Sequence, residues 1–221
     1  MGKTLAVIHT GPVSVEPLAR LIAEALPSVR LVNIVDDSLL KDVIAAGGVT
    51  SRVARRLCQY MMISEDMGAD VILNACSSVG EVVEVARNLV SIPIVRVDEP
   101  MAERAAEFGE TIGVVATVKT TLDPTARLIG DKAAAKGKKV SIKRALCSGA
   151  FEALSAGNPE EHDRLLTVCV EDLAKDVDVI VLAQVSMARL APKLAGRVRV
   201  PVMTSPKLAV EAVKRVIDAL P

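Results

Sequence analysis

One cysteine turn holds the residues best suited to chemistry. Cys76 ends an apolar run, and Ser77 and Ser78 follow it directly, ahead of Gly80 and a helical pattern. At a helix start, the dipole and the free backbone N–H groups favour a thiolate and can bind a carboxylate. The serine hydroxyls can donate further hydrogen bonds or cap the helix. We expect Cys76 to act as acid, base or nucleophile; simple burial in the core is the alternative interpretation.

Polar residues also follow the first strand-like run, residues 4–10, where His9, Thr10 and Gly11 stand together. A histidine can move protons near neutral pH, so His9 is a candidate catalytic residue, with a purely structural role as the alternative. Thr10 and Gly11 are candidate substrate-binding residues. We expect this loop to border the same site as Cys76.

The sequence TVKTT forms a candidate second anion site. Lys119 supplies a positive charge, and the hydroxyls of Thr117, Thr120 and Thr121 supply donors. Alternatively, Thr120 or Thr121 only caps the helical pattern that follows. The sequence alone leaves both interpretations open.

These segments belong to an internal repeat. Residues 69–78, ADVILNACSS, return 108 positions later as residues 177–186, VDVIVLAQVS. The run TLAVIHT at residues 4–10 returns as TIGVVAT at residues 111–117. The chain is therefore one structural unit written twice, and we expect two similar halves whose strand ends face one central cleft.

The two copies differ at the position that carries the thiol. Gln184 stands where the first copy has Cys76, and Ser186 stands where it has Ser78. A glutamine amide can orient a carbonyl or carboxylate but has no acid or base function near pH 7. Ser186 can donate to a ligand or cap the next helix. The repeat thus predicts a symmetric fold with asymmetric chemistry.

Each half alternates β-branched runs with helical patterns, which is typical of βαβ units and a parallel sheet. The continuous Val, Ile and Leu runs predict strands that are buried on both faces. The expected strands are residues 4–10, 29–35, 70–75 and 93–97, then 111–117, 140–146, 178–183 and 200–204. The expected helices are residues 15–26, 51–67, 80–89, 99–107, 121–136, 158–174, 186–194 and 206–219.

Composition narrows the possible partners. Lys and Arg number 27, and so do Asp and Glu, which gives no basic surface for nucleic acid or anionic membrane. Only Phe108, Phe151 and Tyr60 are aromatic, which argues against base stacking and large planar cofactors. The N-terminal residues lack a signal-peptide pattern, and no apolar run reaches the roughly 18–20 residues of a membrane span. We expect a reduced, cytoplasmic protein that binds a small molecule.

The remaining cysteines and histidine are weaker candidates. Cys58 and Cys169 fall within helical patterns and are expected in the core, whereas Cys147 ends a strand and is a second candidate for a reactive thiol. His162 lies in a polar helical turn and is expected to be exposed. No cysteine–histidine pattern suits a metal, and no glycine-rich nucleotide motif occurs.

The ordered set of NACSS, IGVVATVKTT and VIVLAQVSMARL resembles the aspartate/glutamate racemase superfamily, which includes hydantoin racemases, arylmalonate decarboxylases and maleate isomerases. The resemblance covers nearly the whole chain. Cys76 matches the first family cysteine, and Thr117 and Thr120 match the family's AT-x-x-T stretch. Gln184 takes the place of the second cysteine, which departs from the two-thiol pattern.

The resemblance implies two flavodoxin-like α/β lobes related by pseudo-twofold symmetry, each with a four-stranded parallel sheet, and an active site in the cleft between them. The lobes would comprise residues 1–97 with 206–221, and residues 98–205. The family works without pyridoxal, metal or nucleotide cofactors on small carboxylates and often forms homo-oligomers. We therefore expect an isomerase or racemase that uses Cys76, with a malonate-type decarboxylase or a non-catalytic acid-binding protein as alternatives.

Overall fold

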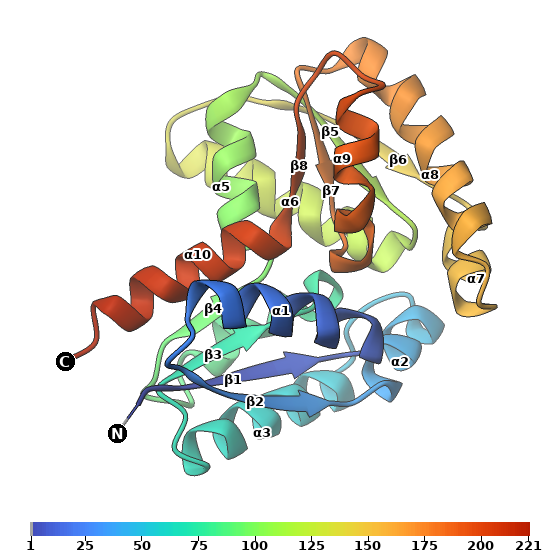
Figure 1. Cartoon of the computed structure of the whole chain (residues 1–221). Coiled ribbons are helices and arrows are strands. Elements are labelled where there is room, and N and C mark those ends of the chain that lie inside the picture. Colours follow the sequence, from blue (N-terminus) through green and yellow to red (C-terminus); the bar gives the residue numbers. More distant parts are fainter. Residues whose placement is uncertain (1) are drawn as a thin grey trace. The chain divides into compact units, whose positions relative to one another are not determined.

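The computed structural model describes residues 2–221 and divides the chain into two compact units. Unit 1 comprises Met1–Pro100 and Pro206–Pro221, and unit 2 comprises Met101–Ser205. Each unit is an α/β structure built on one four-stranded sheet (Figure 1). Both sheets are parallel throughout, so the expected α/β class and the two four-stranded parallel sheets are confirmed.

The two sheets have the same strand order, as the internal repeat requires. Unit 1 has the order β2-β1-β3-β4, and unit 2 has β6-β5-β7-β8. The strands of unit 1 are β1 (Thr4–His9), β2 (Arg30–Val35), β3 (Val71–Asn74) and β4 (Ile94–Arg96). Those of unit 2 are β5 (Thr111–Ala116), β6 (Ser141–Leu146), β7 (Val179–Leu182) and β8 (Val202–Thr204).

All eight strands lie within the ranges expected from the sequence, but burial on both faces holds for only some of them. The central strands β1 and β3, and β7 in unit 2, are buried along their whole length. The edge strands β2 and β6 alternate between partly buried and exposed residues, and β8 is partly buried. The expectation was therefore wrong for β2, β6 and β8, whereas the edge strand β4 is buried as expected.

The sequence pattern predicts the helices of the structure except two. The structure contains α2 and α7, which were not expected, and the turns after β3 and β7 begin as short 3₁₀ helices. The α-helices are α1 (Val15–Ala25), α2 (Ser38–Ala46), α3 (Ser51–Asp66), α4 (Val82–Ala86), α5 (Glu99–Phe108), α6 (Lys119–Ala135), α7 (Ala150–Ser155), α8 (Pro159–Leu173), α9 (Ala191–Ala195) and α10 (Ser205–Asp218). The 3₁₀ helices are η1 (Pro12–Ser14), η2 (Ser77–Val79), η3 (Ala174–Asp176) and η4 (Val185–Leu190).

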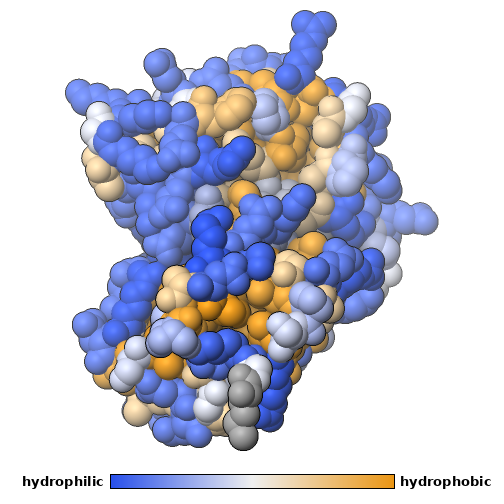
Figure 2. Space-filling view, turned by 60° about the vertical axis from the view of Figure 1, so that its left-hand side comes forward, coloured by the Kyte–Doolittle hydropathy of each residue, from blue (hydrophilic) through white to orange (hydrophobic). Residues whose placement is uncertain are grey.

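Helices cover both faces of the unit 1 sheet (Figure 1). Ala6 and Ile8 of β1 pack in one core cluster with Leu39 of α2 and Leu57 of α3. Alternation along the strand turns the other β1 side chains to the opposite face, where α1 lies. In unit 2 the corresponding cluster joins β5 and β7 to α8 and α9. Outside these cores, hydrophilic residues cover most of the surface in Figure 2, and hydrophobic residues show in separate patches.

The amino ends of the central strands are tied by one acidic residue in each unit. In unit 1 the Asp70 carboxylate accepts a hydrogen bond of 2.6 Å from the backbone N–H of Thr4. In unit 2 the Asp178 carboxylate accepts bonds of 2.9 and 2.7 Å from the N–H groups of Glu110 and Thr111. The repeat therefore extends to the side chains that connect the loops before each strand pair.

His162 corrects the sequence-based expectation of an exposed side chain, because it is 0% exposed. Its helix α8 buries one face through Leu166 and Val170, and His162 precedes them by one and two turns on that same face. The Nδ1 atom lies 3.0 Å from the Asp163 carboxylate and 3.2 Å from Arg189, whereas Nε2 has no partner among the described residues.

Candidate functional site

Cys76 lies immediately beyond the carboxyl end of β3, in extended backbone at the start of η2. The N–H of Ala75 donates to the carbonyl of Ile8 in β1, which fixes the approach to the turn. The Asn74 side-chain NH₂ donates to the Cys76 carbonyl over 3.0 Å. A short turn, fixed by these hydrogen bonds, therefore holds the thiol at the carboxyl end of the strands of unit 1.

The Cys76 sulfur is surrounded by hydrogen-bond donors. The backbone N–H groups of Ser78 and Val79 and the side chains of Ser78 and Thr10 all form hydrogen bonds with it. Thr10 comes from the end of β1, so two neighbouring strands build this environment. The residues Cys76, Ser78 and Thr10, selected from the sequence, are brought together within unit 1.

The ionisation of Cys76 runs opposite to the expectation from the sequence. Burial raises the pKa of the thiol, and the four hydrogen bonds oppose that rise without reversing it. The following element explains part of the difference, because η2 is a three-residue 3₁₀ helix with little dipole of its own. The raised pKa keeps the Cys76 thiol protonated and neutral at pH 7.

Asn74 is a residue of this turn that the sequence reasoning missed. Its side chain is fully buried, and its Oδ1 atom has no hydrogen-bond partner among the described residues. A polar residue at the end of the apolar run VILNA was the available signal, since its counterpart in the second copy is Leu182. A buried acceptor beside the Cys76 carbonyl can receive a donor from a ligand.

His9 is fully buried at the end of β1, and both of its ring nitrogens are engaged. Nδ1 lies 2.7 Å from the Ser14 hydroxyl, and Nε2 lies 3.0 Å from the Asn33 side-chain oxygen. Burial lowers the pKa of His9, and the Asn33 bond partly opposes that shift. Its side chain thus links β1 to β2 and η1. Gly11 follows with extended backbone and open space at its Cα.

A buried ion pair supports the Cys76 turn at Gly80. Its two residues were not identified from the sequence. The guanidinium of Arg96, at the end of β4, donates to the Asp98 carboxylate over 3.2 and 3.1 Å. Both residues are buried, and Asp98 is 0% exposed. The same guanidinium covers Gly80, where a Cβ would lie only 2.6 Å from an Arg96 nitrogen. Glycine is needed there because the arginine occupies the space of a side chain.

Unit 2 repeats the contact between strand ends with different chemistry. Gln184 follows β7 in extended backbone at the start of η4. Its side-chain oxygen accepts a bond of 2.7 Å from the Thr117 N–H and one of 2.9 Å from the Thr117 hydroxyl. Thr117 therefore contacts Gln184 as Thr10 contacts Cys76. With its oxygen engaged, the Gln184 amide presents N–H donors.

The other unit 2 candidates lie around the same two strand ends. Lys119 is exposed and begins α6, directly after Val118. Thr120 has a buried hydroxyl with no partner among the described residues. Thr121 is buried, and its N–H donates to the Val118 carbonyl over 3.1 Å. Ser186 is partly buried within η4, and Ser77 is buried within η2 of unit 1.

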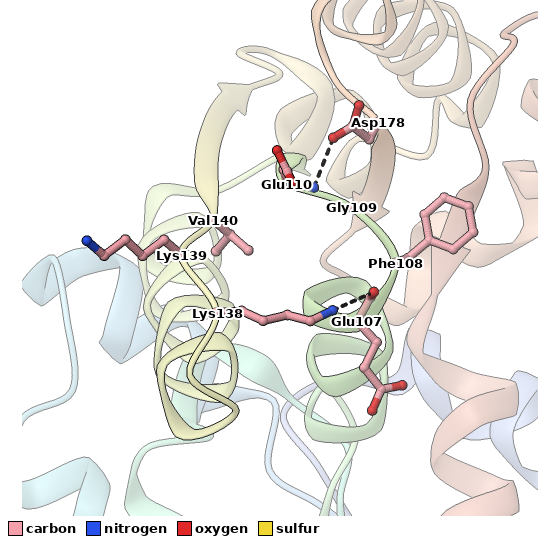
Figure 3. Close-up of a pocket in the computed structure, with 8 residues that line it drawn as sticks. All are labelled: Glu107, Phe108, Gly109, Glu110, Lys138, Lys139, Val140 and Asp178. Atoms are coloured by element: carbon pink, nitrogen blue, oxygen red, sulfur yellow. Dashed lines mark hydrogen bonds between the residues drawn. The ribbon is translucent and has the colours of Figure 1, made fainter.

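A cavity of about 590 Å³ lies at the amino ends of the unit 2 strands (Figure 3). Two of the charged groups at its wall are engaged: Asp178 accepts from two backbone N–H groups, and Lys138 donates to the Glu107 carbonyl over 2.8 Å. The cavity is lined by Glu107, Phe108, Gly109, Glu110, Lys138, Lys139, Val140 and Asp178. It is therefore separate from Thr117 and Gln184, at the other ends of the strands.

Neither a metal centre nor a membrane-spanning helix is present among the described residues. Among residues 2–221, no group of three or more His, Cys, Asp or Glu side chains is placed to hold a metal ion. No helix in the described part of the chain is long and apolar enough to cross a membrane.

Comparison with solved structures reveals close similarity of fold at low sequence identity. Glutamate racemase from Francisella tularensis subsp. tularensis SCHU S4, in complex with D-glutamate, is 14% identical, with a TM-score of 0.77 over 98% of this chain and 81% of that one. Allantoin racemase from Klebsiella pneumoniae is 19% identical, with a TM-score of 0.72 and coverage of 98% and 88%. Picrophilus torridus aspartate racemase is 12% identical, with a TM-score of 0.74 and coverage of 98% and 95%.

At these identities the structures establish a shared fold. No curated protein sequence matches this chain. The family model described as Asp/Glu/Hydantoin racemase matches residues 7–213, which spans both units and includes Cys76, Thr117 and Gln184. The resemblance noted in the sequence is thereby confirmed. The chain belongs to the Asp/Glu/Hydantoin racemase family.

Proposed function

We propose that this protein is a cofactor-independent isomerase of the racemase type, which acts on a small carboxylate or carbonyl compound through Cys76. The observation that carries the proposal is the set of four donors around one partly buried sulfur at a strand end. Core cysteines do not need such donors, whereas a sulfur that alternates between thiol and thiolate does. Family membership supports the same reaction class.

In this proposal Cys76 exchanges a proton with a carbon next to the carboxylate. The neutral thiol delivers a proton to a carbanionic intermediate, and the resulting thiolate is held by the Ser78 and Val79 N–H groups and the Thr10 and Ser78 hydroxyls. In the reverse direction the thiolate removes the proton. Fixed donors aimed at developing charge are worth roughly a hundredfold or more in rate.

We propose that the strand ends of unit 2 bind the polar groups of the substrate. Gln184, with its oxygen held by Thr117, offers N–H donors to a carboxylate or carbonyl oxygen. Lys119 adds a positive charge at the start of α6. The Thr120 hydroxyl, which has no partner within residues 2–221, adds a donor. Thr121 and Ser186 are the remaining binding candidates of unit 2, and Gly11 and Ser77 are those of unit 1.

The amide at Gln184 makes this a one-thiol enzyme in our proposal. Racemisation by two thiols requires one on each side of the reacting carbon, and an amide cannot take that part. His9 is the candidate for a second proton carrier in unit 1. Its lowered pKa keeps it neutral at pH 7, so it would accept a proton through the Ser14 hydroxyl, 2.7 Å from Nδ1.

A decarboxylase is the second candidate function, because one thiol and one amide suit a reaction that needs protonation on a single face. Loss of carbon dioxide from a malonate-type acid leaves an enolate, and neutral Cys76 supplies the one proton that completes the product. Both functions use the same thiol, and they differ in whether the substrate loses mass.

The test incubates the protein in deuterium oxide with D-glutamate, aspartate, allantoin and a malonate-type acid. NMR follows hydrogen exchange at the reacting carbon, chiral chromatography follows inversion, and a gas trap follows carbon dioxide. Isomerase activity predicts exchange without mass loss, and Cys76→Ala should reduce its rate at least about a hundredfold. Cys58→Ala is the matched control, because it removes the other thiol of unit 1 from the core. Equal activity of Cys76→Ala and Cys58→Ala would refute the proposal.

A further inference from the structure

Unit 2 contains a second pair of sulfur atoms that the proposed function does not use. Cys147 follows β6 directly, and Cys169 lies in α8, which packs against β6. Both side chains belong to the same apolar cluster, Cys147 buried within it and Cys169 packed against its edge. Twenty-two positions of sequence separate them, yet the fold brings both side chains into one cluster.

The two thiols interact directly and unequally. The Cys147 S–H donates a hydrogen bond to the Cys169 sulfur, and this bond lowers the pKa of Cys169 despite its partial burial and the nearby Asp172 carboxylate. The same bond, together with burial, raises the pKa of Cys147. Cys169 is thus the sulfur that ionises first, and it is also the more exposed of the two.

We propose that Cys147 and Cys169 form a redox-active modification site, which hydroperoxides oxidise to an intramolecular disulfide. Three features support this assignment: the two side chains are hydrogen-bonded within one packed cluster, Cys169 is partly accessible, and Cys147 is shielded from solvent. An accessible attacking thiol with an adjacent resolving thiol is the arrangement that converts peroxide oxidation into a disulfide.

The chemistry balances in two steps. The Cys169 thiolate attacks the terminal oxygen of the hydroperoxide, the O–O bond breaks, and Cys169 becomes a sulfenic acid while water or an alcohol leaves with one proton. The Cys147 sulfur then attacks the Cys169 sulfur, the S–S bond forms, and the hydroxyl leaves as water with the Cys147 proton. The two thiols lose two electrons, and the peroxide gains them.

The disulfide would tie the end of β6 to the middle of α8. The enclosed segment contains α7 and the first half of α8, where Asp163 forms an ion pair with Arg189 of η4. Because Gln184 directly precedes η4, the thiol pair lies one helix away from the unit 2 turn that we assign to substrate binding. The inference itself does not depend on that assignment.

The test treats the native protein with hydrogen peroxide, blocks free thiols and maps tryptic peptides without reduction. Residues 145–164 carry Cys147 and residues 165–175 carry Cys169, so trypsin separates the two. We expect the two peptides joined, with a mass about 2 Da below the sum of the free peptides. Dithiothreitol should release them.

Two variants and an internal control keep the outcome decisive. In Cys147→Ser, peroxide should leave Cys169 as a sulfenic acid that dimedone traps, and in Cys169→Ser no linked peptide should form. Cys58 is buried in unit 1 and should stay unmodified under the same treatment. Over-oxidised Cys169 in the wild type without a linked peptide would overturn the inference, as would disulfides only between molecules. Neither result would affect the proposed role of Cys76.

Discussion

Gly80→Ala provides a sharp test of how the Cys76 turn is supported. The added Cβ would lie 2.6 Å from one Arg96 nitrogen and 3.0 Å from the guanidinium carbon and Nε. Such distances force the guanidinium to move. Its two bonds to Asp98 hold it in place, and Asp98 is 0% exposed, so the movement leaves a buried carboxylate without its partner.

The expected magnitude follows from two opposing effects. Breaking a buried ion pair costs about 3–5 kcal/mol. Replacing glycine by alanine returns about 1 kcal/mol, because Gly80 has right-handed helical backbone angles of φ −59° and ψ −34°. We therefore expect Gly80→Ala to lower the free energy of unfolding of unit 1 by about 2–4 kcal/mol.

Urea denaturation followed by tyrosine fluorescence measures this change, because Tyr60 is the only tyrosine of the chain and lies in α3 of unit 1. Gly48→Ala is the matched control in the same unit, since a Cβ there meets nothing within 4 Å, and its effect should stay below about 0.5 kcal/mol. In an Arg96→Ala background the cost of Gly80→Ala should largely vanish. Equal stability of Gly80→Ala and Gly48→Ala would show that Arg96 does not restrain this position.

Two further predictions concern the pH dependence of stability and the Asp178 carboxylate, which binds backbone N–H groups at the amino end of β5. Burial lowers the pKa of His9, so the unfolded chain binds the proton first, and the stability from neutral His9 is complete above pH 6.5 and is lost as pH falls below that value. Urea titrations should show that this loss is smaller in His9→Gln, and identical pH dependences would contradict the assignment. Asp178→Ala should cost about 1 kcal/mol in chemical denaturation through its two backbone bonds, whereas Asp176→Ala, 67% exposed at its side chain, should cost less than about 0.5 kcal/mol. Equal losses of unfolding free energy in the two variants would show that the Asp178 hydrogen bonds do not stabilise unit 2.

The strands and the repetition of one topology were the most predictable parts of the fold. Apolar β-branched runs mark each strand, and the repeat between residues 69–78 and 177–186 requires two copies of one topology. Helix α2 was missed although its signals are present: Leu39 and Val43 are one turn apart, and Gly47 ends the helix with a φ of 72°. Short helices carry too few turns for periodicity to separate them from loops.

The site was predictable only where residue type and strand end coincide. Cys76 and Gln184 were identified from their positions after apolar runs, and the structure adds contacts that join distant parts of the sequence. The hydrogen bonds from Thr117 to Gln184 form because β5 and β7 are neighbours in the sheet. The Arg96 guanidinium lies against Gly80 because β4 is the neighbour of β3. The raised pKa of Cys76 depends on burial, which sequence spacing does not reveal.

The most direct measurement of the role of Cys76 is quantitative alkylation. Iodoacetamide should modify the native thiol slowly at pH 7 and faster as pH rises, because burial raises its pKa. The compound that undergoes hydrogen exchange in the deuterium oxide assay then serves as substrate. Its exchange rate should fall in direct proportion to the fraction of Cys76 alkylated, as counted by mass spectrometry. Added before iodoacetamide, the same compound should protect the thiol from alkylation. Full exchange activity in a protein whose Cys76 is completely alkylated would contradict the assignment of Cys76 as the reacting group.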